Sequence, residues 1–177
     1  VAVMLAAHKL KAGAGNGEKI LFMAPTKPLT VQHEKSFKRF MTIPEEEIVS
    51  VTGAISPKKR QDLYEGATVI TATAQTIESD LLNGRLNLKD FALVIFDEAH
   101  RAVGEYAYVF INLQLQKQNP DALVVALTAS PGSGEEKIQD VCKNLSIKNI
   151  EIKEHDDEDV KPYVNEIQAD WVMVDLP

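Results

Sequence analysis

Short apolar runs alternate with amphipathic segments along most of the chain. The runs are rich in apolar and β-branched residues and lie at 19–24, 48–51, 68–72, 91–96 and 122–127. The segments that follow them space their apolar residues as helices do, at 28–40, 57–64, 75–82, 105–118 and 135–145. Continuous apolar strands separated by helices are typical of a parallel sheet that is covered on both faces. The pattern therefore predicts an α/β fold.

The two ends of the chain differ from this pattern. Residues 1–10 (VAVMLAAHKL) predict a helix that no capping residue precedes, so we expect a chain that has lost its beginning. Near the other end, 149–153 and 170–176 could form strands on either side of the acidic run 154–159. We expect that run to be a solvated loop, with a metal site as the alternative. The chain stops without a terminal element, which suggests that more protein follows.

Composition narrows the class of protein. The chain has 177 residues, of which 45% are hydrophobic and 25% charged, values that fit one folded domain and exclude a mainly disordered or fibrous protein. No apolar run approaches the roughly 18 residues that a membrane span needs. The single cysteine, Cys142, excludes a disulfide within the chain and argues against a cysteine-based zinc site. The net charge of −7 argues against gripping nucleic acid by bulk positive charge, but it leaves a local basic patch open.

The clearest candidate for chemistry is the tetrapeptide Asp97-Glu98-Ala99-His100, which directly follows the apolar run at 91–96. Ligands of open parallel sheets bind beyond the carboxyl ends of the strands. An aspartate there can hold a Mg²⁺ that bridges nucleotide phosphates, and the adjacent glutamate can act as general base toward water. The alternative is a pair of exposed acids in a loop. The whole tetrapeptide in this context favours catalysis.

A second candidate is Thr128-Ala129-Ser130, which directly follows the apolar run at 122–127. It lies about 30 residues after Asp97, roughly the length of one βαβ step. Hydroxyls at the end of that strand can reach the acidic loop of its neighbour. The alternative is a turn of small residues before Pro131.

These segments resemble motifs II and III of the superfamily 2 helicases, the DEAH box and a Ser/Thr-Ala-Thr/Ser triplet. The resemblance extends to APTKPLTVQH at 24–33, which looks like motif Ia, and to Thr52-Gly53, which looks like motif Ib. The segment VITATAQT at 69–76 resembles the motif that next contacts nucleic acid. Their order and spacing are similar to the first RecA-like domain of these enzymes over about residues 1–145.

Within the superfamily, four segments look like the archaeal Hef helicase/nuclease branch and its eukaryotic Fanconi anaemia M-type relatives. They read FDEAHRA, GEYAY, LTASPG and DVKPYV, at 96–102, 104–108, 127–132 and 159–164. This branch acts on branched DNA such as stalled forks and carries a helical insertion between its two RecA-like domains. Dicer-type and innate-immune RNA helicases share much of the pattern, so an RNA helicase remains an alternative. A RecA-like module that only binds is a further alternative, which the retained Glu98 argues against.

The resemblance implies ATP-driven movement on nucleic acid, with ATP and Mg²⁺ as cofactors. Asp97 would bind Mg²⁺, Glu98 would activate water, and His100 would sit with them at the nucleotide. His100, Thr128 and Ser130 would couple the nucleotide state to the nucleic acid. The residues that would line the path of one strand are Pro25, Thr26, Lys27, Gly53, Thr73 and Gln75. For Lys27 the alternative is a solvated surface lysine.

One expected part of such an enzyme, the phosphate loop GxxxxGK[ST], has no match in the chain. The segment at 13–19 (GAGNGEK) fails because Glu18 separates Gly17 from Lys19, and 132–137 (GSGEEK) fails in the same way. The resemblance places the true loop just before Val1.

The predicted organisation is therefore a RecA-like domain over 1–150 without its first strand and phosphate loop, and a tail over 151–177. The tail would lead toward the helical insertion or the second motor domain. Expected partners are branched or forked DNA and the second RecA-like domain of the same polypeptide, without a membrane. The isolated fragment should fold but hydrolyse no ATP, and the protein should be cytoplasmic in an archaeon or nuclear in a eukaryote.

Overall fold

The computed structural model describes residues 1–13, 17–130, 135–153, 157–158 and 160–161. The strands of the described chain are β1 (Lys19–Ala24), β2 (Ile48–Val51), β3 (Val69–Thr73), β4 (Phe91–Asp97) and β5 (Leu123–Leu127). The helices are α1 (Ala2–Ala12), α2 (Lys27–Phe40), α3 (Pro57–Gly66), α4 (Ala74–Leu82), α5 (Ala107–Gln118) and α6 (Glu135–Asn144), with short 3₁₀ helices η1 (Glu45–Glu47) and η2 (Ala99–Arg101). The α/β prediction is confirmed.

The strands form one parallel sheet in the order β2-β3-β1-β4-β5. The chain leaves β1 through α2 toward one face of the sheet and leaves β4 through η2 and α5 toward the other. The carboxyl ends of β1 and β4 are neighbours, because Met23 pairs with Phe96. Neighbouring parallel strands whose connections diverge in this way form the switch point at which open α/β sheets bind ligands.

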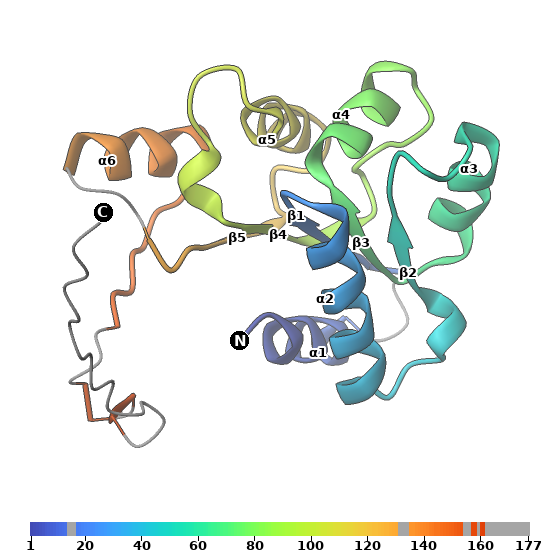
Figure 1. Cartoon of the computed structure of the whole chain (residues 1–177), viewed down its shortest axis with the longest axis horizontal. Coiled ribbons are helices and arrows are strands. Elements are labelled where there is room, and N and C mark those ends of the chain that lie inside the picture. The colour runs from blue at the N-terminus through green and yellow to red at the C-terminus, as the bar shows by residue number, and fades with distance from the viewer. Residues whose placement is uncertain (14–16, 131–134, 154–156, 159, 162–177) are drawn as a thin grey trace, which may run out of the picture.

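Helices cover both faces of the sheet (Figure 1). Along β1, Ile20 and Phe22 point into the core under α1 and α2, whereas Leu21 and Met23 point into the core under α3 to α6. This alternation is the period of two that a strand imposes. The apolar residues of β1 are fully buried between the two cores, so the sheet is a well-packed platform for the loops that follow its strands.

Two predicted strands need correction. The strand at 122–127 is present as β5, but its residues are half-buried or exposed rather than buried, because β5 lies at the sheet edge and pairs only with β4. The predicted strand at 149–153 is wrong: that segment is irregular, with Ile150 and Ile152 60% and 72% exposed. Its alternating pattern suits a strand, but it pairs with neither edge of the sheet. The segment 170–176 and most of the acidic run lie outside the described residues.

In the part of the chain that the structure describes, no helix combines the length and the apolarity needed to cross a membrane.

Replacing Phe22 with alanine should lower the free energy of unfolding by about 3–5 kcal/mol, because the ring lies fully buried in the central strand and packs against Phe37. Phe40→Ala is the matched control, since that ring is 65% exposed, and it should cost no more than about 1 kcal/mol. Urea denaturation followed by circular dichroism measures both values. Equal losses for the two variants would contradict the central position of β1.

Candidate active site and nucleic-acid path

The loop after β4 has an unusual backbone. Asp97 is the last residue of β4, and Glu98 adopts the left-handed conformation, with φ 52° and ψ 48°, before η2 begins at Ala99. A side chain other than glycine adopts this conformation rarely, at a cost of about 1–3 kcal/mol, and usually where the surrounding structure enforces it. The bend turns the chain sharply at the carboxyl end of β4. Asp97 and Glu98 lie half-buried there.

A buried tyrosine from α5 holds the start of this bend. The Tyr108 hydroxyl lies 2.7 Å from the Asp97 carbonyl oxygen and 3.2 Å from that of Met23, and can donate its proton to either. Burial raises the pKa of Tyr108 well above its ordinary value, so the hydroxyl remains a donor at any physiological pH. Tyr108 thus joins the ends of β1 and β4 at the switch point.

Two asparagines hold the far side of the loop. Asn144 on α6 donates to the Ala102 carbonyl at 2.9 Å, and Asn112 on α5 donates to the Asn144 carbonyl at the same distance. The loop is therefore attached to both α5 and α6, and its conformation is set by the fold rather than by its own sequence.

A histidine from α2 reaches the acidic loop. His33 Nε2 lies 3.5 Å from Asp97 Oδ2, and its ring packs on Phe22 with ring centroids 4.2 Å apart. Sequence reasoning placed His33 in the segment like motif Ia but gave it no role. Its position at the end of that segment was the one available signal.

The second candidate triplet meets the acidic loop through one hydroxyl. His100 Nδ1 lies 3.0 Å from Thr128 Oγ1 and 3.3 Å from Glu98 Oε2. The predicted contact between Thr128 and the loop is therefore present. Among the described residues, the Ser130 hydroxyl makes no hydrogen bond, but the Ser130 backbone N–H donates to Thr128 Oγ1 at 3.2 Å. The pairing of Asp97 with Leu127 explains why the two loops meet.

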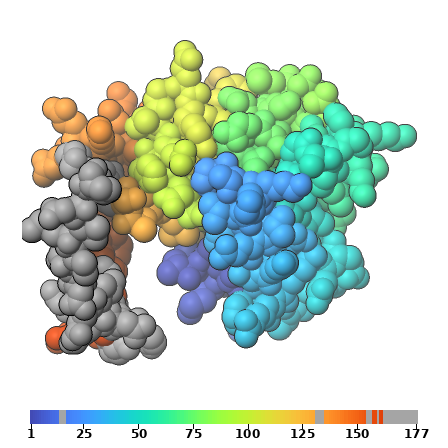
Figure 2. Space-filling model, in the orientation of Figure 1, coloured from blue at the N-terminus to red at the C-terminus, as the bar shows by residue number. Residues whose placement is uncertain are grey.

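The residues predicted to line the path of a nucleic-acid strand lie at the edge of the sheet formed by the carboxyl ends of its strands. Pro25 and Thr26 join β1 to α2, which Lys27 begins. Gly53 follows β2, and Thr73 and Gln75 lie where β3 runs into α4. The side chains of Thr26, Lys27 and Gln75 are exposed, as is Gly53. Figure 2 shows the blue surface of α2 adjoining the yellow-green surface of the segment after β4 on one face of the molecule. The structure therefore brings the path residues to the edge that carries the acidic loop.

The donors at this edge suit a magnesium ion that arrives with a nucleotide. Within the described residues, no group of three or more His, Cys, Asp or Glu side chains could hold a metal by itself. Mg²⁺ does not need such a cage, because it usually takes one or two carboxylates and completes its shell with water and substrate phosphates. Asp97 supplies a carboxylate of this kind, which is partly open to solvent.

Comparison with known proteins identifies the family. The sequence profile of the DEAD/DEAH box helicases matches residues 1–138. The chain belongs to this family. The crystal structure of the Hef helicase domain of Pyrococcus furiosus is 51% identical, with a TM-score of 0.89 over 99% of this chain and 37% of that one. The fold is thus the RecA-like helicase fold of Hef.

Some curated relatives are named RNA helicases and others DNA helicases. A Methanocaldococcus jannaschii protein provisionally named ATP-dependent RNA helicase MJ1505 is 42% identical over 90% of this chain and 20% of that protein. The ATP-dependent DNA helicase mph1 of Sclerotinia sclerotiorum is 40% identical over 89% of this chain and 13% of that protein. The chain therefore spans about a fifth of the first of these helicases and less of the second.

Tyr108→Phe should lower the free energy of unfolding by about 1–3 kcal/mol, because it leaves the Asp97 carbonyl without its buried donor. Tyr106→Phe is the matched control. The Tyr106 ring touches Tyr108 edge to face, but its hydroxyl makes no hydrogen bond among the described residues. Thermal and urea unfolding of both variants measure the effect, and an unchanged stability for Tyr108→Phe would contradict the role of this hydroxyl.

Proposed function

We propose that the chain is the first motor domain of an ATP-dependent helicase or translocase that acts on branched or forked DNA. The observation that carries the proposal is the His100–Thr128 contact, which joins the acidic loop to the loop after β5 at the edge where the strand-path residues lie. In this proposal, a site for nucleotide hydrolysis and a surface for a nucleic-acid strand share the edge of the sheet at which the strands end. The likeness to the Hef helicase domain and to the mph1 DNA helicase supports DNA as the substrate.

In this proposal the residues of the acidic loop divide the chemistry. When bound with the nucleotide, Mg²⁺ neutralises charge on the phosphates. Asp97 holds the metal, and Glu98 orients a water and accepts its proton as general base. His100 sits within reach of both Glu98 and Thr128, so a change at the nucleotide can shift the loop after β5. Together with His100, Thr128 and Ser130 couple the nucleotide state to the nucleic acid.

The strand path uses contacts to the backbone of the nucleic acid. Lys27, the hydroxyls of Thr26 and Thr73, the amide of Gln75 and the open backbone at Gly53 can hold phosphates and sugars without reading bases. Pro25 fixes the exit of the chain from β1. The amino ends of α2, α3 and α4 lie at this edge, and helix amino ends favour anions. The net charge of −7 does not oppose this, since binding depends on the local field.

The proposal for the whole protein extends beyond these residues. The tail 151–177 leads toward a helical insertion or the second RecA-like domain of the same polypeptide, and the protein works in the cytoplasm of an archaeon or the nucleus of a eukaryote. An RNA helicase remains a second candidate, since two relatives, MJ1505 and the Arabidopsis FANCM protein, are named RNA helicases.

Steady-state ATP hydrolysis by the full-length protein with forked DNA, duplex DNA or RNA separates these candidates. We expect the largest stimulation with forked DNA. A larger stimulation with RNA would favour the Dicer-like alternative, and no ATP hydrolysis with any nucleic acid would favour a module that only binds.

Glu98→Gln in the full-length protein should lower ATP turnover at least about 100-fold while Mg-ATP binding persists, because the amide keeps the shape but accepts no proton. Asp97→Asn should also weaken the binding of Mg²⁺. The control is Glu105→Gln, an exposed acid in the same connection between β4 and α5. Steady-state ATPase and nucleotide titration measure these effects, and near-normal turnover in Glu98→Gln would remove its role as base.

Thr128→Ala should lower the ratio of unwinding rate to ATPase rate at saturating DNA, while folding and basal ATPase are largely kept. The contact with His100 contributes about 1 kcal/mol, too little to build the fold but enough to bias two loop arrangements. Ser130→Ala keeps its backbone N–H and should have the smaller effect, and the double variant should resemble Thr128→Ala. An unchanged ratio in the double variant would make this triplet a simple turn.

A further inference from the structure

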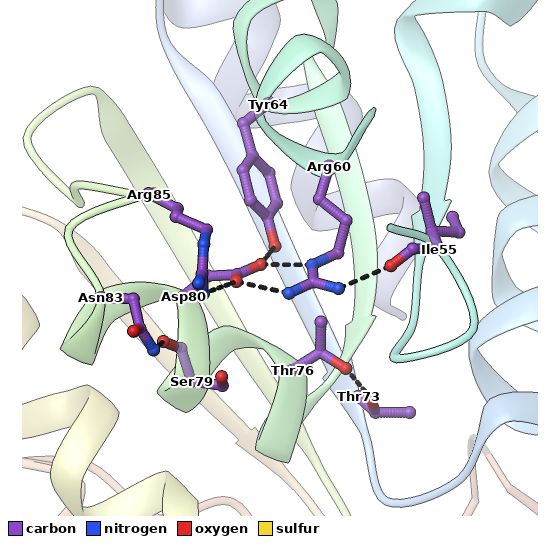
Figure 3. Close-up of polar contacts among 9 residues, drawn as sticks. All are labelled: Ile55, Arg60, Tyr64, Thr73, Thr76, Ser79, Asp80, Asn83 and Arg85. Carbon is purple, nitrogen blue, oxygen red and sulfur yellow. Dashed lines mark hydrogen bonds and ion pairs between the residues drawn. The ribbon is translucent and has the colours of Figure 1, made fainter. Parts of the chain in front are cut away.

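A buried ionic cluster joins α3 to α4 outside every motif named above (Figure 3). Arg60 on α3 donates from Nε and from one terminal nitrogen to the two carboxylate oxygens of Asp80 on α4, each at 2.6 Å. The Tyr64 hydroxyl donates to the same carboxylate at 2.7 Å, and Arg85, beyond the end of α4, lies 3.2 Å from it. One carboxylate thus receives four donors.

The cluster keeps its charges although it is buried. Asp80 has no exposed surface, and Arg60 and Tyr64 are almost fully buried. Burial alone would raise the pKa of Asp80, but hydrogen bonds from Arg60 and Tyr64 outweigh it and lower that pKa below its ordinary value. Apolar side chains of similar volume often stabilise a fold as well as a buried ion pair does. Stability alone therefore does not require this pair, and its geometry suggests a further use.

Arg60 also holds the turn that carries Gly53. The Ile55 N–H donates to the Thr52 carbonyl at 3.0 Å, which closes a turn with Gly53 inside it. The remaining terminal nitrogen of Arg60 donates to the Ile55 carbonyl at 2.6 Å. The guanidinium therefore ties the end of this turn to Asp80 on α4.

The same turn also lies close to the amino end of α4. A Cβ built on Gly53 would lie 3.9 Å from Thr76 Oγ1, so the turn passes close to the first turn of α4. Thr76 Oγ1 in turn lies 2.8 Å from Thr73 Oγ1. Two of the proposed strand contacts, Gly53 and Thr73, are therefore held next to each other, and Arg60 with Asp80 fastens the elements that carry them.

We propose that Arg60 and Asp80 are positioning residues that set the Gly53 turn against the start of α4, at the spacing that one nucleic-acid strand requires. This proposal rests on the proposed function, since it concerns the same strand path. An arginine suits the role because its planar fork donates to both carboxylate oxygens and to a carbonyl at once, which the single ammonium of lysine cannot do in the same geometry.

The test compares Arg60→Lys with Arg85→Lys in the full-length protein. Both variants keep their charge, but Arg85 makes no hydrogen bond to the turn. Fluorescence anisotropy gives the Kd for a labelled single-stranded DNA, and ATPase titration gives the DNA concentration at half-maximal stimulation and the kcat at saturation. Thermal unfolding reports the stability of each variant.

For Arg60→Lys we expect the Kd and the half-stimulating DNA concentration to rise about tenfold, with kcat within about twofold of wild type, because the strand contacts are misplaced while the nucleotide site is not. Arg85→Lys should leave both DNA values within about twofold. Equal weakening in the two variants would reduce the cluster to a structural role and overturn the proposal.

A double variant, Arg60→Met with Asp80→Leu, keeps the test open if the lysine variant unfolds, because it removes both charges and fills the space. It should fold and bind DNA as weakly as Arg60→Lys, and wild-type affinity in the folded double variant would overturn the proposal.

Lys27→Ala distinguishes a failure of the positioning role from a failure of the proposed function. Weaker binding in Lys27→Ala with unchanged binding in Arg60→Lys would overturn positioning alone. A wild-type protein that binds no strand would remove the proposed function and this inference together.

Discussion

The parallel direction of the strands is the constraint on which the site depends. Because every described strand runs the same way, the loops after β1, β2, β3, β4 and β5 all emerge at one edge of the sheet. Residues as far apart in sequence as Lys27, Gly53 and Thr128 therefore share one edge without any dedicated contact between them. The divergence of α2 and α5 to opposite faces leaves the ends of β1 and β4 open to a ligand.

Hydrogen bonds from α5 and α6 set the backbone of the loop after β4. The Tyr108 hydroxyl lies between the Met23 and Asp97 carbonyls, Asn144 holds Ala102, and Glu98 accepts a left-handed backbone between these two anchors. Each bond contributes only about 1 kcal/mol, yet together they can offset the cost of the strained residue. The bend after β4 therefore depends on donors from α5 and α6.

Apolar periodicity was sufficient to predict the strands, the helices and their α/β arrangement, because each element has to bury its apolar face. Periodicity failed at 149–153, where alternation indicates a strand but the segment pairs with no strand of the sheet. It also failed at β5, an outer strand whose residues are half-buried or exposed.

The place of the candidate site, at the carboxyl ends of the strands, could be predicted because each motif directly follows a strand.

Contacts that depend on tertiary structure were beyond sequence reasoning. Nothing in the spacing of Arg60 and Asp80, or in the identity of His33, indicates that they meet a partner from another element. The left-handed Glu98 is also hidden, since its residue type normally avoids that conformation. For Ser130, the hydroxyl suggested a contact with the acidic loop. Among the described residues, only its backbone N–H makes a hydrogen bond, to Thr128 Oγ1.

The most direct test of a shared edge is the thermodynamic linkage between nucleotide and strand. In the full-length Glu98→Gln variant, the Kd for single-stranded DNA is measured with and without Mg-ATP, and the Kd for Mg-ATP with and without the DNA. Linkage requires the two ratios to be equal, and coupled sites typically give a factor of about 5–150. We expect equal ratios that differ clearly from one. Ratios of one in both titrations would contradict this expectation, since the two ligands would then occupy sites that do not sense each other.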